Sequence, residues 1–208
     1  ASFEIARHLG IRHFIQLDDD YTSFYYRFNS SLQYEPRPIR SLDQVFAAMV
    51  EYLKHSGIAT IAMAQGGDFI GGAENTGFAQ QVTLKRKAMN SFVCDAERPF
   101  SFVGLMNEDV NTYTLKASRG LIMMTANQVS LTQLATQETA GGMAEFYRSQ
   151  GTYVKSFYTV MMHPSSVHIK MLATTHSRWH HRIDWTLTVP KIIRENVRTI
   201  APDILELQ

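Results

Sequence analysis

The order of apolar segments in the first third of the chain constrains the fold most. Residues 11–17 have the pattern of a buried strand, residues 42–55 place their apolar side chains on one helical face, and residues 58–63 form a second short apolar strand. Ser41 before the helix and Gly57 after it are typical cap residues. A strand, a helix and a strand in this order predict a βαβ crossover, and hence an α/β fold with a mainly parallel sheet flanked by helices.

Later segments extend this prediction along the chain. Residues 121–125, 154–162 and 167–172 are apolar or alternating, as strands are, and residues 143–150 are typical of a short helix. No repeat, low-complexity tract or linker interrupts the pattern. We therefore expect residues 1–208 to form a single domain.

Composition excludes several classes of protein. The chain is 45% hydrophobic and 19% charged, which is typical of a globular protein. Its formal net charge of +1 argues against a surface that is cationic all round, so a nucleic-acid contact would need a local basic patch. Cys94 is the only cysteine, which excludes an intrachain disulfide and a cysteine zinc cluster and suits the cytoplasm. No apolar run approaches the roughly 20 residues that span a bilayer, so we expect no membrane partner.

Three aspartates follow the first predicted strand directly. Ligands of open α/β sheets bind beyond the carboxyl ends of strands, and residues two apart in an extended segment point to the same side. Asp18 and Asp20 can therefore converge, while Asp19 faces away. Two converging carboxylates repel unless a cation lies between them, and Mg²⁺ or Mn²⁺ prefers such oxygen ligands and in turn bridges phosphates. An exposed acidic turn is the alternative.

A second acidic pair, Glu108-Asp109, lies far along the chain after an apolar segment. A carboxylate at this position can act as a general base that deprotonates an acceptor hydroxyl. Acidic residues are also common in the first turn of a helix for electrostatic reasons, and the sequence leaves both interpretations open.

Glycine pairs and a basic cluster offer contacts to a phosphorylated ligand. Glycine lets the backbone approach a ligand closely, although simple turns are an equal alternative. Neither a GxGxxG nor a P-loop pattern is present, which disfavours a dehydrogenase or an ATPase. Lysines could neutralise a diphosphate, with solvated surface charge as the alternative. The predicted contacts are Gly66, Gly67, Lys85, Lys87, Gly141 and Gly142.

Histidines are concentrated late in the chain, and an imidazole could complete a metal site begun by the aspartates. Adjacent side chains of a strand point to opposite faces, so at most one of His180 and His181 is a ligand. We predict His181, with His180 and His168 as alternatives.

Taken in order, these motifs resemble the TET-associated glycosyltransferases, a family that includes phage enzymes and a domain of an estrogen-regulated vertebrate growth protein. The resemblance rests on residues 16–20 (Gln-Leu-Asp-Asp-Asp), 86–91 (Arg-Lys-Ala-Met-Asn-Ser), 107–111 (Asn-Glu-Asp-Val-Asn), 137–147 and 179–182 (Trp-His-His-Arg).

The resemblance implies a GT-A (Rossmann-like) fold with a mixed sheet. It also implies that Asp18 and Asp20 hold a divalent cation, that Asp18 and Asp19 contact the diphosphate of a nucleotide-sugar, and that the Glu108-Asp109 region contacts the acceptor. A GT-A domain begins with a strand and loop that grip the nucleobase. Nothing before Asp18 is long enough to provide them, so we expect that segment to precede residue 1.

The sequence therefore predicts a metal-dependent glycosyltransferase that uses Mn²⁺ or Mg²⁺ and a nucleotide-sugar, with a UDP-sugar favoured. For the phage branch of the family the leading acceptor is 5-hydroxymethylcytosine in DNA, which would be flipped from the duplex. Three alternatives remain: a protein O-glycosyltransferase of the same fold, a Mg²⁺-dependent nuclease or nucleotidyltransferase, and a non-catalytic binding domain.

Overall fold

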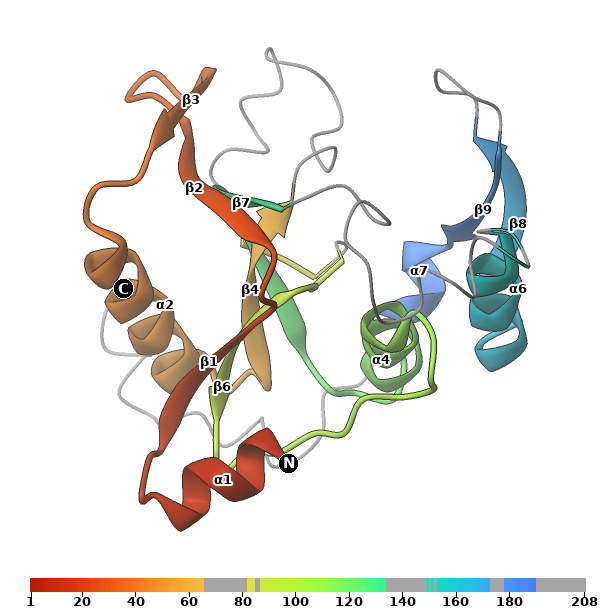
Figure 1. The fold of residues 1–208 in the computed structure, drawn as a ribbon, viewed down its shortest axis with the longest axis horizontal. Coiled ribbons are helices and arrows are strands. Elements are labelled where there is room, and N and C mark those ends of the chain that lie inside the picture. The colour runs from red at the N-terminus through yellow and green to blue at the C-terminus, as the bar shows by residue number, and fades with distance from the viewer. Residues whose placement is uncertain are drawn as a thin grey trace.

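The computed structural model describes residues 1–65, 82–84, 87–133, 149, 151, 153–172 and 178–189 (Figure 1). The helices are α1 (Ser2–His8), α2 (Leu42–Ser56), α4 (Glu108–Ala117), α6 (Tyr153–Met162) and α7 (Trp185–Thr188). The strands are β1 (His13–Leu17), β2 (Tyr21–Phe28), β3 (Tyr34–Pro38), β4 (Thr60–Gln65), β5 (Val82–Thr83), β6 (Ser91–Asp95), β7 (Met123–Gln133), β8 (Val167–Leu172) and β9 (Arg178–Ile183). Within these ranges no helix has the length and apolar character needed to cross a lipid bilayer.

One mixed sheet forms the centre of the molecule. Its strands lie in the order β1-β6-β4-β7-β2-β3, with β5 also paired to β7, while β8 and β9 form a separate two-stranded ribbon. β4 and β7 are parallel, and the other described neighbours are antiparallel. The predicted α/β class, with a mixed sheet flanked by helices in a Rossmann-like arrangement, is confirmed.

Fewer neighbouring strands of the sheet are parallel than the predicted βαβ crossover implied. β1 precedes α2 in the chain and β4 follows it, and the two strands run in the same direction. In the sheet, however, β6 lies between them and is antiparallel to both. All five residues of β6 are buried. β6 lies inside the sheet although it carries Ser91, Cys94 and Asp95. These residues interrupt the apolar pattern from which a buried strand is predicted.

Helices cover both faces of the sheet and bury two apolar clusters. α2 packs through Val45, Met49 and Leu53 onto the face that presents Ile61 and Val93. The opposite face is covered by α1, through Phe3, and by α4, through Val110 and Tyr113, which cluster with Phe92 of β6 and with Phe100. The predicted helix over residues 42–55 is confirmed, and Gly57 ends it in the left-handed conformation at φ 64°.

The prediction of a strand over residues 154–162 is wrong, because these residues form α6. A short apolar run cannot be assigned to strand or helix by periodicity alone. Here the buried residues are Ser156 and Thr159, while Tyr153, Phe157 and Met161 are exposed along one side of the helix. The strand over residues 167–172 is confirmed as β8, and the strand at 121–125 is the start of the longer β7. The predicted helix at 143–150 lies outside the described residues except for Ser149.

A buried ion pair closes the end of the sheet near α1. The Asp95 carboxylate is fully buried and pairs with Arg98 at 3.0 Å and with Arg12 at 3.6 Å. Arg98 also donates to the Ile58 carbonyl at 2.6 Å and to the Leu53 carbonyl at 2.8 Å, which joins β6 to the end of α2. Burial raises the pKa of Asp95, but hydrogen bonds and the two arginines outweigh it, so the net pKa is below the ordinary value.

Replacing Arg98 with alanine is expected to lower the free energy of unfolding by about 2–3 kcal/mol, because it leaves the buried Asp95 carboxylate under-paired. Urea unfolding at neutral pH measures this loss. Because the folded-state pKa of Asp95 is lowered, its contribution is present above the unfolded pKa and lost as pH falls through the folded value. The difference between wild type and variant should therefore shrink in acid. The matched control is Arg37→Ala, which breaks an exposed pair with Glu35 and should cost less than about 1 kcal/mol. Equal losses in the two variants would contradict the assignment.

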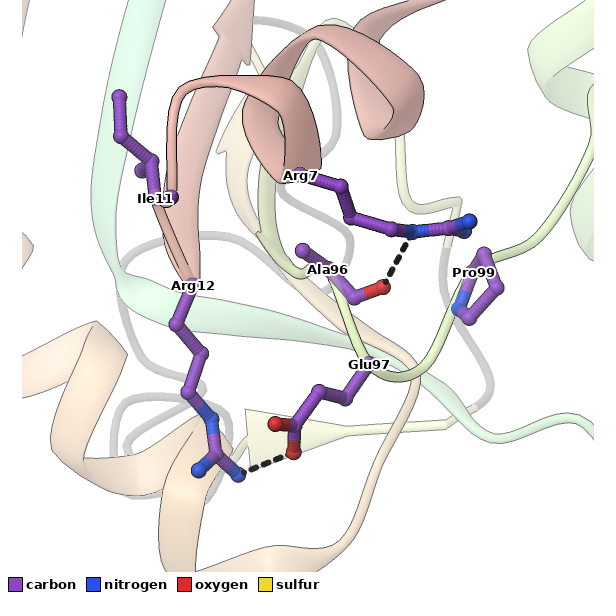
Figure 2. Close-up of a pocket in the computed structure, with 7 residues that line it drawn as sticks. Arg7, Ile11, Arg12, Ala96, Glu97 and Pro99 are labelled. Atoms are coloured by element: carbon purple, nitrogen blue, oxygen red, sulfur yellow. Dashed lines mark hydrogen bonds and ion pairs between the residues drawn. The ribbon is translucent and has the colours of Figure 1, made fainter.

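Beside this ion pair lies a pocket of about 550 Å³ between the end of α1 and the turn after β6. Figure 2 shows Arg7 and Arg12 on its two sides. Arg7 donates from Nε to the Ala96 carbonyl at 3.2 Å, and Arg12 pairs with Glu97 at 3.0 Å. Both arginines are thereby fixed to the β6 turn, so the pocket is part of the framework that anchors α1.

Candidate functional site

Polar side chains gather at the end of the sheet opposite Asp95. β1, β4 and β7 all finish at this edge, since Leu17 lies opposite Ser91 at the start of β6, and Gln65 lies opposite Leu131 near the end of β7. Asp18 follows β1 directly. In sheets of this class the carboxyl ends of such strands are where ligands bind.

The structure brings the two predicted acidic groups together at this edge. The pKa of Asp18 is raised to about 6, first by burial and then by the negative charges of Asp20, Glu108 and Asp19. The pKa of Asp109 is also raised to about 6, first by burial and further by the charges of Glu108 and Asp18, against the hydrogen bond from the Val110 N–H to its Oδ1 at 2.7 Å. Side chains far apart in the sequence therefore share one negative field.

The first turn of α4 is held in place from outside the helix. Asn107, just before it, adopts a left-handed conformation with φ 48°, which costs roughly 1–3 kcal/mol for a non-glycine residue. Its amide donates to the Lys155 carbonyl at 3.1 Å and to the Thr159 hydroxyl at 3.0 Å, both on α6. These bonds offset the strain and orient the turn, which leaves Glu108 exposed and Asp109 half-buried.

A chain of side-chain amides holds Asp20. Gln133, the last residue of β7, donates from Nε2 to both carboxylate oxygens of Asp20 at 3.3 Å. The Oε1 atom of Gln133 accepts from Asn90 at 2.6 Å and from Gln65 at 3.3 Å. Two donors on Oε1 determine which way the Gln133 amide faces, so its NH₂ group must point at Asp20.

Sequence reasoning missed Gln65, Asn90 and Gln133 as site residues. Each amide stands at the boundary of an apolar strand, which is a sequence signal, but only the register of the sheet reveals that the three meet. Asn90 has a further mark in the structure, a left-handed φ of 56° just before β6. A non-glycine residue in that conformation often belongs to a functional turn.

His181 lies in a different electrostatic setting from the aspartates. Burial lowers the pKa of His181 to about 3, and the charges of His180, Lys155 and Lys87 lower it further. Its Nδ1 is buried and has no hydrogen-bond partner among the described residues. The alternative ligand His168 instead interacts with Asp184. Across the described ranges, no three His, Cys, Asp or Glu side chains are close enough to hold a metal ion, so His181 as a metal ligand stays a prediction.

Five of the predicted donor contacts cannot be placed. Gly66, Gly67, Lys85, Gly141 and Gly142 lie outside the described residues. Lys87 is described: its carbonyl accepts from the Thr125 hydroxyl on β7 at 2.9 Å, and its charge acts on His181. The lysine thus lies near the sheet edge that carries the acidic groups.

The chemistry of the acidic group fits a divalent cation. Asp18 and Asp20 offer oxygen atoms, which hard cations prefer. In the part of the chain that the structure describes, no lysine or arginine forms an ion pair with Asp18, Asp20 or Asp109. Their mutual repulsion would be relieved by a bound positive charge.

Comparison with known proteins gives one match. The model of a family described as TET-Associated Glycosyltransferase matches residues 1–142, which include both acidic groups and the three residues of the amide chain. No curated protein and no solved structure matches the chain.

Proposed function

The chain belongs to the TET-associated glycosyltransferase family, and from this premise we propose that it is a metal-dependent enzyme that moves a sugar from a nucleotide-sugar to a hydroxyl acceptor. The donor to test first is a UDP-sugar, and the proposed acceptor is 5-hydroxymethylcytosine or a related modified base in phage DNA. The observation that carries the proposal is the shared electrostatic field of Asp18 and Asp109, which joins a strand-end aspartate to the first turn of α4.

Asp109 is the proposed general base. With a pKa of about 6 it is largely ionised at neutral pH yet basic enough to take a proton. One carboxylate oxygen accepts the hydroxyl proton as the hydroxyl oxygen attacks the anomeric carbon. The bond from that carbon to the donor phosphate breaks, and the nucleoside diphosphate leaves with the electron pair. Glu108, which is exposed, is the alternative base.

Asp18 and Asp20 are the residues that would hold Mn²⁺ or Mg²⁺. When bound, the cation supplies positive charge that stabilises the diphosphate as a leaving group. His181 is the proposed third ligand, since burial lowers its pKa to about 3, which keeps the ring neutral at physiological pH, and since its Nδ1 has no partner in the part of the chain that the structure describes. Lys87, with Lys85 and the glycine pairs, is proposed to contact the donor diphosphate, and Asp19 has a side role there.

The decisive experiment offers the protein a panel of UDP-sugars with Mn²⁺ and a duplex that contains 5-hydroxymethylcytosine. The expected result is a DNA product heavier by one sugar, detected by mass spectrometry, that is lost on chelation of the metal. Parallel reactions contain unmodified DNA, a Ser/Thr-rich protein, or no nucleotide-sugar. Transfer only to the protein would replace the DNA acceptor, and cleavage of DNA without a donor would indicate a nuclease instead.

Replacing Gln133 with methionine is expected to weaken Mn²⁺ binding by roughly 10–100-fold, the usual loss when the hydrogen-bond partner of a metal-binding carboxylate is removed. Methionine fills similar space but cannot donate to Asp20. Electron paramagnetic resonance of free Mn²⁺ measures the affinity, and the melting temperature reports the fold. Gln44→Met on the exposed side of α2 is the matched control. If Gln133→Met lowers only the melting temperature, the amide chain is structural and does not position Asp20.

A further inference from the structure

The charge of the chain is strongly segregated along the sequence. Residues 146–183 contain no aspartate or glutamate, although the whole chain has 19 of them and a net charge of only +1. The same segment contains five Lys and Arg residues and five histidines, namely Arg148, Lys155, Lys170, Arg178, Arg182, His163, His168, His176, His180 and His181. This segment carries an excess of positive charge, which a polyanionic partner would need.

The β8–β9 ribbon displays part of this charge on one face. His168 lies opposite Arg182 and Lys170 lies opposite His180, and residues directly opposite in an antiparallel pair project from the same face. His168, Lys170 and Arg182 are exposed. Val167, on the other face, is 1% exposed, and that face carries the contact with the rest of the protein.

Among the described residues, no carboxylate forms an ion pair with Lys170 or Arg182, the lysine and arginine of this ribbon face. Asp184 is the carboxylate that acts on His168, but it is engaged by Thr186 through its backbone N–H at 2.9 Å and its hydroxyl at 2.6 Å. Trp179 lies opposite Met171 and therefore projects from the other face of the ribbon, the face of Val167, with 51% of its area exposed.

The β8–β9 ribbon is connected to α4, the helix that carries the proposed base, through packing contacts and hydrogen bonds. α6 packs against both β8 and β9, and Asn107 at the start of α4 bonds to α6. The ring of Trp185, just after β9, stacks on Tyr113 of α4 with centroids 5.6 Å apart. Figure 1 shows the ribbon and α6 together beside α4, on the far side of the molecule from α2. The ribbon is therefore held next to the helix that carries Glu108-Asp109.

We propose that the face of the β8–β9 ribbon formed by His168, Lys170 and Arg182 binds the sugar-phosphate backbone of a nucleic acid and thereby delivers a base to Asp109. Lysine and arginine contacts to phosphate supply affinity without sequence preference. The inference rests on the proposed function for the identity of the acceptor, and on the ribbon geometry for the binding surface. An anionic membrane is the rival partner, and it is less favoured because this face is polar.

The test measures binding of the full chain to a short fluorescein-labelled DNA duplex by anisotropy over a range of NaCl concentrations. The test variant is Lys170→Gln/Arg182→Gln, and the matched control is Lys54→Gln/Arg40→Gln, which removes the same charge from exposed positions near α2. Each lost phosphate contact reduces the slope of log K against log salt by about 0.9, so the test variant should lose about two units of slope and at least tenfold in affinity at moderate salt, and the control neither. Equal behaviour of the two variants, or no binding by wild type at low salt, overturns the proposal. Binding of wild type to phosphatidylserine vesicles but not to duplex, with loss in the test variant, overturns it in favour of a membrane.

A separate assay distinguishes failure of the ribbon from failure of the enzyme. Transfer to the free nucleoside 5-hydroxymethyl-2′-deoxycytidine does not require a backbone, so the test variant should retain wild-type transfer to the nucleoside while losing transfer to duplex. If wild type transfers to both but the variant is unimpaired on duplex, the ribbon assignment is wrong and the function stands. If wild type transfers to neither, the acceptor is wrong, and duplex binding alone decides the ribbon.

Discussion

Replacement of Asp109 with asparagine is expected to lower the rate of sugar transfer by roughly 10²–10⁴-fold, the usual contribution of a positioned general base. Asparagine keeps the size of the side chain, and its oxygen can still accept the Val110 N–H, so the first turn of α4 should be preserved. It cannot take the proton of the acceptor hydroxyl. Single-turnover transfer with saturating donor measures the loss directly, and donor affinity should stay near the wild-type value.

Glu108→Gln is the matched variant for this experiment. Glu108 is exposed and Asp109 is half-buried, with its pKa raised to about 6 mainly by burial. We expect Glu108→Gln to reduce transfer far less, because its main effect on the site is the negative charge that it adds beside Asp18 and Asp109. A severe loss in Glu108→Gln with near-normal turnover in Asp109→Asn would transfer the role of base to Glu108.

The pH dependence provides an independent readout of the same assignment. Because the base must be ionised, kcat/KM should rise with pH through the pKa of Asp109, which burial raises to about 6, and then level off. Stability should follow the opposite trend. A carboxyl whose pKa is raised by folding stabilises the fold fully below its unfolded pKa, and that contribution is lost as pH rises through the folded value. At neutral pH, Asp109→Asn should therefore be more stable than wild type, by at most about 3 kcal/mol.

The sequence was informative where one element determines its own pattern. The helix over residues 42–55 has its caps and its apolar face within a single segment, and the structure reproduces it as α2. The acidic groups were found for the same reason, since each follows an apolar segment that ends abruptly. The strand predicted over residues 154–162 was wrong, because the side chains that α6 buries are Ser156 and Thr159 rather than its apolar ones.

What the sequence could not provide depends on register between distant segments. The Gln133 amide reaches Asp20 because Tyr21 pairs with Gln133 across β2 and β7, and Asn90 and Gln65 arrive from two further strand ends. No periodicity within one segment encodes that meeting. The position of β6 between β1 and β4 has the same origin, because it is decided by burial of the whole strand among neighbours rather than by its own composition.

Replacement of Asp20 with asparagine is expected to abolish metal-dependent transfer. The loss of Mn²⁺ affinity should exceed the roughly 10–100-fold expected for Gln133→Met, because a ligand is removed rather than the partner that orients it. The asparagine oxygen can still accept from Gln133, so the fold and melting temperature should be preserved. Mn²⁺ binding by electron paramagnetic resonance and transfer to the modified duplex are measured on the same preparation.

Two further aspartates make this experiment specific. Asp43→Asn removes a carboxylate from the exposed first turn of α2 and should change neither Mn²⁺ affinity nor transfer. Asp19 lies between the two proposed ligands. Because adjacent side chains of an extended segment face opposite sides, the effect of Asp19→Asn should be clearly smaller than that of Asp20→Asn. If Asp20→Asn transfers sugar at the wild-type rate, or if chelation leaves wild type active, the carboxylates at the end of β1 do not hold a metal. In that case the negative charge that these carboxylates share with Asp109 would act only on the acceptor.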